Sequence, residues 1–247
     1  MSESDLTELA DFREILSSRF EDEYPLLVGG HAVNLWASFY SASIGSRLAK
    51  WLPLTSKDLD LFGTVSLLEA LKDRFGGSFR LSGPRSPVVG QLVTNLGGPE
   101  LKVDVLRDVY GLRKSQLLAE AIVIEIEMAG HHFHCRVLPV IVLLEAKIAN
   151  LANLDQSGRN DLKHVHLMLL VAEQFLSALV EAVDLEGADS RSVVNQLELA
   201  RKVTATPEAQ RCAKAYNLDF STIWPRELLE QSQDSRLQNF VKHRLPR

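Results

Sequence analysis

The chain has 247 residues, of which 46% are hydrophobic and 24% charged, with 14 Gly, 9 Pro and 2 Cys. This is the composition of a globular protein with one large or two small domains, and it excludes a disordered chain, a collagen and a disulfide scaffold. The net charge of −5 argues against a general electrostatic binder of nucleic acid, but residues 47–114 carry eleven basic and seven acidic side chains, so we expect an anionic ligand to bind there.

Three features bear on where the protein acts. No uninterrupted apolar run approaches the roughly 18 residues of a membrane span, and the longest, residues 137–144, contains Pro139. The acidic N-terminus lacks the basic and apolar segments of a signal peptide. Cys135 and Cys212 stand alone, as is typical of reduced thiols. We therefore expect a cytoplasmic protein that does not engage a membrane.

The first predicted elements are a helix over residues 4–20, a short buried strand over 24–28 and a helix over 31–40. Both helices rest on apolar residues that recur at steps of three and four. Gly29 and Gly30 separate the strand from the second helix, and residues 41–53 are predicted to be irregular.

The middle of the chain alternates between polar and apolar residues. This pattern predicts strands over residues 58–62, 88–95, 101–106, the last part of 117–127, and 132–138, with a helix over 66–75 that Gly76 and Gly77 end. After Pro139 no strand signal returns, and helices are predicted over residues 140–154, 161–176 and 188–203, with another starting at Thr206 and Pro207. We expect two domains, one of strands and helices over residues 1–138 and a helical one over 139–247.

Three aspartates are the candidate chemical groups. Asp58 and Asp60 stand two apart on a predicted strand, so both side chains point to one face. Two carboxylates so close repel each other unless they share a cation, and Mg²⁺ prefers such oxygen ligands. Asp104 lies on another predicted strand, and the three converge if the two strands are neighbours. That arrangement suits one or two Mg²⁺ ions that hold a triphosphate and activate an attacking hydroxyl.

The double glycine is a candidate phosphate site. Without Cβ atoms, Gly29 and Gly30 let a phosphate approach the backbone, and the next helix offers free N–H groups and the positive end of its dipole. Each signal also has a purely structural interpretation, since two glycines often form a tight turn and an Asp-x-Asp pair can lie on an exposed strand.

The order of Gly-Gly, helix, Asp-x-Asp strand and third Asp resembles the nucleotidyltransferase superfamily related to DNA polymerase β. A closer resemblance is to bacterial AbiEii-type toxin nucleotidyltransferases, through the GG-x-A turn at residues 29–32, the T-S-x-D-L-D strand at 55–60, the V-L-P, L-L and K positions within 137–147, and the R-x-D element at 159–161. The resemblance covers roughly residues 24–170. It implies an α+β fold in which a small mixed sheet with flanking helices precedes an all-helical C-terminal region.

The resemblance also implies roles for the residues of the first domain. Gly29 and Gly30 would form the phosphate loop, and Asp58 and Asp60 would bind Mg²⁺. Asp104 would complete the metal site or act as the base on the incoming hydroxyl.

Further roles follow for basic residues and for the R-x-D element. Lys57 and Lys147 would meet the triphosphate, although Lys147 also fits a lysine that extends from an apolar helix face. Asp161, supported by Arg159, would position the helical region, and pairing with Lys147 is one way for it to do so. The chain departs from the family pattern at Asn160, where a Lys is common, and in the long spacing of 28 positions from Gly30 to Asp58.

The implied reaction is transfer of a nucleoside monophosphate from an NTP to an acceptor, with release of pyrophosphate. The acceptor would be RNA such as a tRNA end, a protein hydroxyl or a small molecule, and the protein would be the toxin of a toxin–antitoxin or phage-defence system with an antitoxin partner. The alternative is a catalytically inactive module of the same fold that binds nucleotide, RNA or a partner protein.

Other chemistry is less favoured. Two more groups of possible metal ligands occur, namely His131, His132, His134 and Cys135 on a predicted strand, and His164 and His166 on a predicted helix. Alternation splits the first group between two faces and leaves it without a second ligand pair, and residues two apart on a helix do not face one ligand. The sequence has no Walker A motif and no G-x-S-x-G elbow, which excludes a P-loop ATPase and this type of serine hydrolase.

Overall fold

A computed structural model describes residues 6–128 and 130–245 and confirms the predicted α+β class. Within these residues, the main sheet has the strand order β5 (Ser78–Leu81), β6 (Val88–Asn95), β7 (Glu100–Leu106), β4 (Leu59–Phe62), β2 (Leu26–Leu27), β9 (His131–Val137) and β8 (Ile122–Met128). The sheet is mixed, because β4–β7 and β2–β9 are parallel and the other pairs are antiparallel. A second small sheet pairs β1 (Thr7–Glu8) with β3 (Thr55–Ser56).

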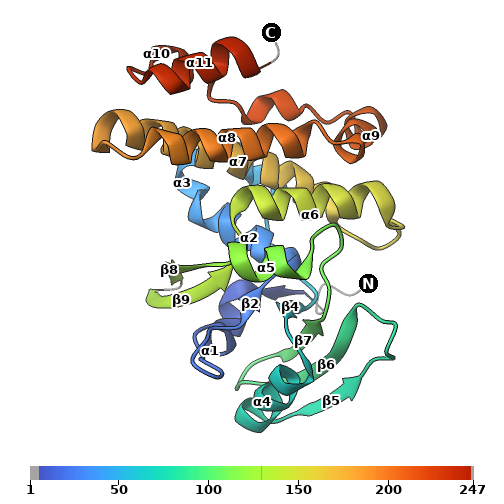
Figure 1. The fold of residues 1–247 in the computed structure, drawn as a ribbon. Helices are drawn as coiled ribbons and strands as arrows, with labels where there is room; N and C mark the ends of the chain where they lie inside the picture. The colour runs from blue at the N-terminus through green and yellow to red at the C-terminus, as the bar shows by residue number, and fades with distance from the viewer. Residues whose placement is uncertain (1–5, 129, 246–247) are drawn as a thin grey trace.

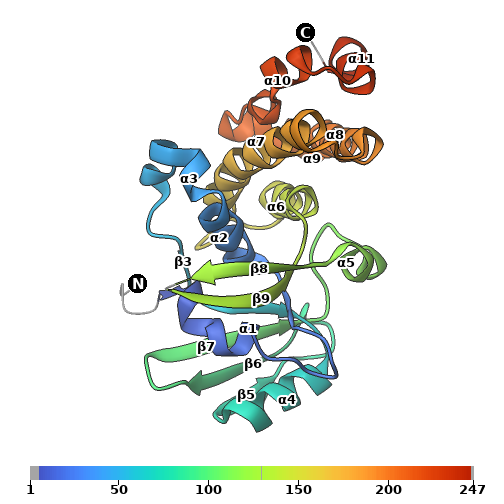
Figure 2. The ribbon, with the colours of Figure 1, turned by 90° about the vertical axis from the view of Figure 1, so that its left-hand side faces the viewer.

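The helices form layers on the sheet (Figures 1 and 2). Helix α4 (Val65–Phe75) lies beside β5 and β6 at one side, and α5 (Lys114–Glu120) precedes β8. On the other side, α2 (Gly29–Phe39) lies between the sheet and a stack of helices built from α6 (Val140–Asn153), α7 (Asp161–Glu186), α8 (Ser190–Thr204), α9 (Pro207–Tyr216), α10 (Arg226–Gln231) and α11 (Ser235–Arg244). Strands therefore end at Val137, and only helices follow in the described chain, as predicted.

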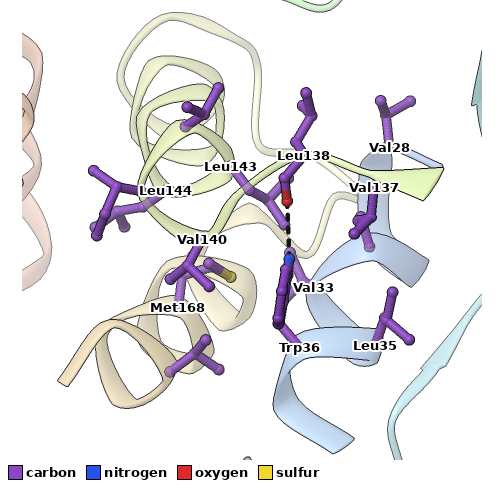
Figure 3. Close-up of a cluster of buried hydrophobic side chains, with 14 of the residues drawn as sticks. Val28, Val33, Leu35, Trp36, Val137, Leu138, Val140, Leu143, Leu144 and Met168 are labelled. Atoms are coloured by element: carbon purple, nitrogen blue, oxygen red, sulfur yellow. Dashed lines mark hydrogen bonds between the residues drawn. The ribbon is translucent and has the colours of Figure 1, made fainter. Parts of the chain in front are cut away.

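The hydrophobic core runs without interruption from the sheet into the helical stack. Figure 3 shows side chains from α2, the end of β9, α6 and α7 packed together, and Trp36 Nε1 donates a hydrogen bond to the carbonyl of Leu138 at 2.9 Å. Trp36 and Leu138 are both buried. The division into two domains between residues 138 and 139 stays a prediction, and the core crosses that point.

Two predicted segments are wrong. Residues 6–20 form no single helix but β1, a 3₁₀ helix η2 (Leu9–Phe12) and a short α1 (Arg13–Leu16), while residues 4 and 5 lie outside the described chain. The apolar residues of this segment do face the core, since Phe12 and Ile15 are fully buried. A helix does not form over the whole segment because β1 pairs with β3 at its start. After it, Glu21 and Asp22 have positive φ angles that turn the chain back. Residues 41–51 are helical instead of irregular, as α3 (Ser41–Ile44) and the 3₁₀ helix η3 (Gly45–Trp51).

Helix α7 is longer than predicted and extends to Glu186. By length and composition alone, this helix of the described chain is long and apolar enough to cross a membrane. Polar residues interrupt its apolar residues, so it contains no long uninterrupted apolar run. Its contacts with α2, α6, α8 and the 3₁₀ helix η4 (Phe220–Ile223) place it at the centre of the helical stack. Packing on several sides accounts for its apolar composition.

Candidate active site

One cavity of about 390 Å³ lies between the sheet and helices α6 and α7. The nine site residues predicted from the sequence all line it: Gly29, Gly30, Lys57, Asp58, Asp60, Asp104, Lys147, Arg159 and Asp161. The fold therefore brings together residues that are up to 132 positions apart in the chain. Their functional roles remain predictions at this point.

The strand register explains how the carboxylates meet. Strands β4 and β7 are parallel neighbours, and Asp60 stands opposite Asp104 in their register. Because side chains alternate along a strand, both carboxylates face the cavity, while Leu59 and Val103 point to the other face and are fully buried. Asp58 comes just before β4 and lines the same cavity.

Burial and mutual repulsion disfavour the charged form of these groups. Burial raises the pKa of Asp60 to about 7, with further contributions from the charges of Asp58 and Asp104 that the charge of Lys147 only partly opposes. Burial also raises the pKa values of Asp58 and Asp104 above their ordinary range, against the effect of neighbouring lysines on Asp58 and of a hydrogen bond on Asp104. An added cation would relieve this repulsion.

The donor set fits Mg²⁺ in chemistry, since it offers carboxylate oxygens from Asp58, Asp60 and Asp104 around one cavity. As the side chains stand, no group of three His, Cys, Asp or Glu among the described residues is close enough to hold a metal ion. Binding of one ion by all three carboxylates therefore requires them to turn toward one another.

Other side chains occupy the space beside Gly29 and Gly30 that a Cβ atom would need. Gly29 has a φ of +68°, and a Cβ atom there would lie 1.8 Å from Asp60 Oδ2. A Cβ on Gly30 would lie 2.8 Å from Ser56 Oγ and 3.2 Å from His164 Cε1. The backbone of Gly30 also hydrogen-bonds to the Asp60 side chain and thereby lowers the pKa of that carboxyl. Gly29 thus leaves room for Asp60, and Gly30 leaves room for Ser56 and His164. The phosphate-binding role of the two glycines stays a prediction.

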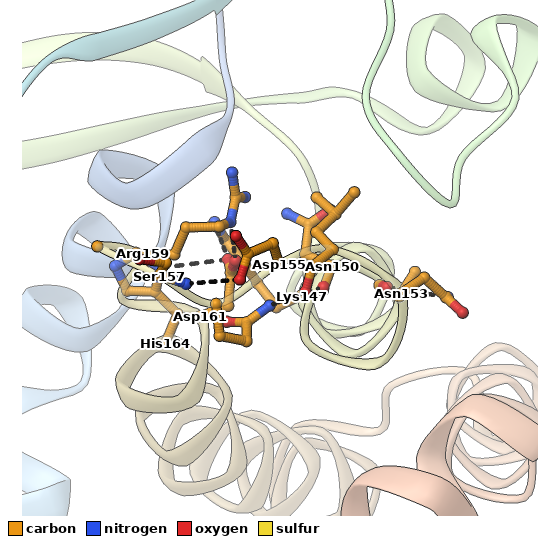
Figure 4. A network of polar contacts seen from close by, with 12 residues as sticks. Lys147, Asn150, Asn153, Asp155, Ser157, Arg159, Asp161 and His164 are labelled. Atoms are coloured by element: carbon orange, nitrogen blue, oxygen red, sulfur yellow. Dashed lines mark hydrogen bonds and ion pairs between the residues drawn. The ribbon is translucent and has the colours of Figure 1, made fainter.

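A cluster of polar and charged side chains, drawn in Figure 4, lines the cavity on the helical side. Asp161 Oδ1 lies 3.8 Å from Lys147 Nζ and 4.0 Å from His164 Nδ1, and Asp161 Oδ2 accepts a hydrogen bond from Arg159 Nε at 2.6 Å. The pairing of Asp161 with Lys147 that the resemblance implied is therefore present. Lys57 Nζ donates to the carbonyl of Gly158 at 3.3 Å, which ties the carboxylate-bearing segment to the same loop.

The charges of this cluster are interdependent. Burial alone would raise the pKa of Asp161, but His164, Lys147 and Arg159 outweigh it and hold the pKa well below its usual range. Burial lowers the pKa of Lys147, although Asp161 and Asp60 oppose this shift. Burial, followed by the charge of Lys147, lowers the pKa of His164 to about 4. At neutral pH, His164 is therefore an uncharged neighbour of the ion pair.

Two residues that contact the site were not predicted from the sequence. One is His164, whose spacing of three from Asp161 on a helix is the sequence signal for their contact. Gln91 on β6 stands opposite Asp104, and its Nε2 donates to Asp104 Oδ1 at 2.7 Å. No local pattern indicates this contact, because it depends on strand pairing.

The other candidate ligands form no site in the described residues. On the exposed surface of the β8–β9 hairpin, His132 Nδ1 lies 3.7 Å from Glu125 Oε1, and His132 Nε2 lies 3.8 Å from Glu127 Oε2. Cys135 and Cys212 are free and buried. No metal-binding group of three is present there, within the part of the chain that the structure describes.

The chain shows little similarity to known proteins. No family model matches the chain, and no curated protein matches it. Among the solved structures it is similar to is an antigenic nucleotidyltransferase-like protein from Paracoccidioides brasiliensis, with 14% sequence identity and a TM-score of 0.36. The match covers 58% of this chain and 66% of that chain, so the chain spans less than two thirds of that protein's length. This likeness is too distant to assign a family, and the function has to be inferred from the geometry of the site.

Proposed function

We propose that the protein is a Mg²⁺-dependent nucleotidyltransferase that moves a nucleoside monophosphate from an NTP to an acceptor hydroxyl. The observation that supports this most directly is the placement of Asp60 and Asp104 opposite each other on parallel strands, with Asp58 beside them, in a cavity that buried Lys147 also lines. Clustered carboxylates next to fixed positive charge suit the binding of a metal–triphosphate complex.

In this proposal, Asp58, Asp60 and Asp104 hold Mg²⁺, which when bound supplies charge stabilisation at the reacting phosphate. Asp104 takes the proton of the acceptor hydroxyl as its oxygen attacks the α-phosphorus. A new phosphorus–oxygen bond forms, the bond between the α-phosphorus and the bridging oxygen breaks, and pyrophosphate leaves with the electron pair. Lys57 and Lys147 line the same cavity and offset the negative charge of the triphosphate.

We further propose an acceptor and a cellular role. The acceptor is RNA such as a tRNA end, a protein hydroxyl or a small molecule, and the resemblance to AbiEii-type enzymes favours a cytoplasmic toxin with an antitoxin partner. An assay with all three acceptor classes distinguishes these possibilities.

A label-transfer assay tests the proposal. The protein is incubated with Mg²⁺ and each α-labelled NTP, together with total RNA, a protein lysate and a panel of small hydroxyl compounds. We expect label on one acceptor class, and a loss of about a thousandfold in Asp58→Asn and Asp60→Asn, because each removes a charged ligand that stabilises the transition state by several kcal/mol. Asp73→Asn on α4, which changes an exposed carboxylate outside the cavity, serves as the control.

The alternative is a nucleotide-binding module without turnover. It is favoured by the position of Asp60, whose carboxylate lies against Gly29. It is also favoured because no three His, Cys, Asp or Glu side chains in the described residues stand close enough to hold a metal ion. Calorimetry that detects Mg²⁺–NTP binding, together with no transfer to any acceptor, would select this alternative.

A further inference from the structure

The cavity extends beyond the carboxylates to a part with different walls. Leu143, Ala146, Asn150 and Leu154 form one stripe along α6 and its C-terminal end, at helical spacing, and Val109 and Tyr110 from the loop after β7 also line the cavity. This part is mainly apolar, although Asp108, which precedes Val109, also lines the cavity. Metal and phosphate binding make no use of it.

Half of the surface of Tyr110 is exposed, although Tyr110 is a large aromatic residue on the cavity wall. The backbone next to it is held against α6, because Gly111 has a φ of +84° and a Cβ atom there would lie 2.4 Å from the Ala149 Cβ. The ring is therefore presented from a loop that is packed tightly on the helix. Exposed aromatic rings in nucleotide sites stack on bases.

Asn150 supplies a polar group in the same part of the cavity. It follows Lys147 by one turn of α6, next to the Asp161 cluster (Figure 4). Its Oδ1 has no hydrogen-bond partner and exposes almost no surface, so the side chain has to turn for this oxygen to meet a ligand. A buried acceptor without a partner is costly, so a ligand that donates an N–H to it gains affinity.

We propose that this part of the cavity is the base-binding subsite of the nucleotide. Tyr110 stacks on the nucleobase, and Asn150 Oδ1 accepts an N–H from the base edge. The triphosphate then reaches the carboxylates and Lys147, which line the other part of the same cavity. This inference rests on the proposed function and adds the residues that recognise the base.

The test compares two probes on the full chain in the presence of Mg²⁺. One probe is each of the four NTPs as a non-hydrolysable α,β-methylene analogue, and the other is inorganic tripolyphosphate, which has the charge but no base. We expect Tyr110→Ala to weaken binding of the preferred nucleotide by about tenfold to a hundredfold, the range that stacking on one base gives, and to leave tripolyphosphate binding unchanged. Tyr110→Phe, which keeps the ring, should restore most of the nucleotide affinity.

Asn150→Leu should weaken nucleotide binding by about tenfold without affecting tripolyphosphate, because only the base reaches Oδ1. Asn153→Leu, on the same helix but outside this cavity, is the matched control. Unchanged nucleotide binding in both Tyr110→Ala and Asn150→Leu, or an equal loss for tripolyphosphate, would overturn the inference alone. If neither probe binds the unaltered protein, the proposed function fails and the base subsite with it.

Discussion

Asp104 is held from the neighbouring strand by a single amide. Gln91 Nε2 donates to Asp104 Oδ1 at 2.7 Å, which fixes the orientation of the carboxylate that we expect to receive the acceptor proton. Gln91→Glu keeps the size of the side chain, but it removes the donor and places a second carboxylate beside the first. We expect kcat to fall by about tenfold to a hundredfold, the equivalent of a charged hydrogen bond of 1.5–3 kcal/mol, with little change in the KM for NTP.

The chain offers a matched control for this exchange. Gln116 Nε2 donates to Glu145 Oε2 at 3.3 Å, outside the carboxylate cavity, so Gln116→Glu makes the same chemical change at another carboxylate. Steady-state kinetics of both variants check the prediction. Equal effects, or a normal kcat in Gln91→Glu, would show that Gln91 does not position Asp104.

His31 makes stability depend on pH. It is fully buried beside Phe12 and Thr7, and burial, with a smaller effect of His164, lowers its pKa to about 3 from the model-peptide value of 6.5. Since the unfolded chain binds the proton more readily, His31 lowers stability as the pH falls below 6.5 toward 3, by about 2 kcal/mol between pH 7 and pH 5. His31→Gln should reduce the pH 7-to-5 loss by this amount.

Urea unfolding at the two pH values measures this difference. His132→Gln, which replaces an exposed histidine, is the control and should keep the full loss. A pH dependence in His31→Gln that equals that of the unaltered protein would contradict the buried, neutral state of His31.

The contact between α6 and α7 depends on an ion pair as well as on apolar packing. Lys147 and Asp161 are both buried, and Asp161 stands at the first position of α7. Asp161→Ala leaves the Lys147 charge buried without its partner, so we expect a loss of about 3–5 kcal/mol in the free energy of unfolding. Lys147→Met in the Asp161→Ala background removes that charge and should restore part of the stability. Chemical denaturation of the single and double variants measures both effects.

An exposed pair provides the comparison. On α9, Arg211 Nη2 lies 3.3 Å from Glu208 Oε1. Because solvent screens exposed ion pairs, Glu208→Ala should lower the free energy of unfolding by less than about 1 kcal/mol. If Asp161→Ala costs no more than Glu208→Ala, the buried pair does not join the two helices.

At the scale of the whole molecule, residues on both sides of the junction at residue 138 belong to one continuous hydrophobic cluster within the described chain. We therefore expect the sheet and the helices to unfold together, with equal calorimetric and van't Hoff enthalpies. Leu143→Ala, at a buried position of α6, should destabilise the protein by about 2–5 kcal/mol and shift that single transition. Differential scanning calorimetry checks this, and two separate transitions would instead support the predicted two-domain division.

Local patterns in the sequence were sufficient for many elements. The strand predicted over residues 88–95 is found with the same bounds as β6, and α6 begins at the predicted residue after Pro139. Thr206 caps α9 by accepting from the N–H of Ala209, as the Thr-Pro signal indicated. These features depend on residues within a few positions of one another, so spacing and capping chemistry determine them. The nine candidate residues likewise came from short motifs and from the family resemblance they carry.

Other features depend on which distant segments become neighbours. Strand order and register bring Asp60 opposite Asp104 and place Gln91 where it donates a hydrogen bond to Asp104. They also bring Asp60 against Gly29. The predicted helix over residues 4–20 failed for the same reason, because pairing of β1 with β3 competes with the local apolar period. A periodic pattern states which face of an element is apolar, but it does not state what that face meets, and the packing of the whole chain supplies that information.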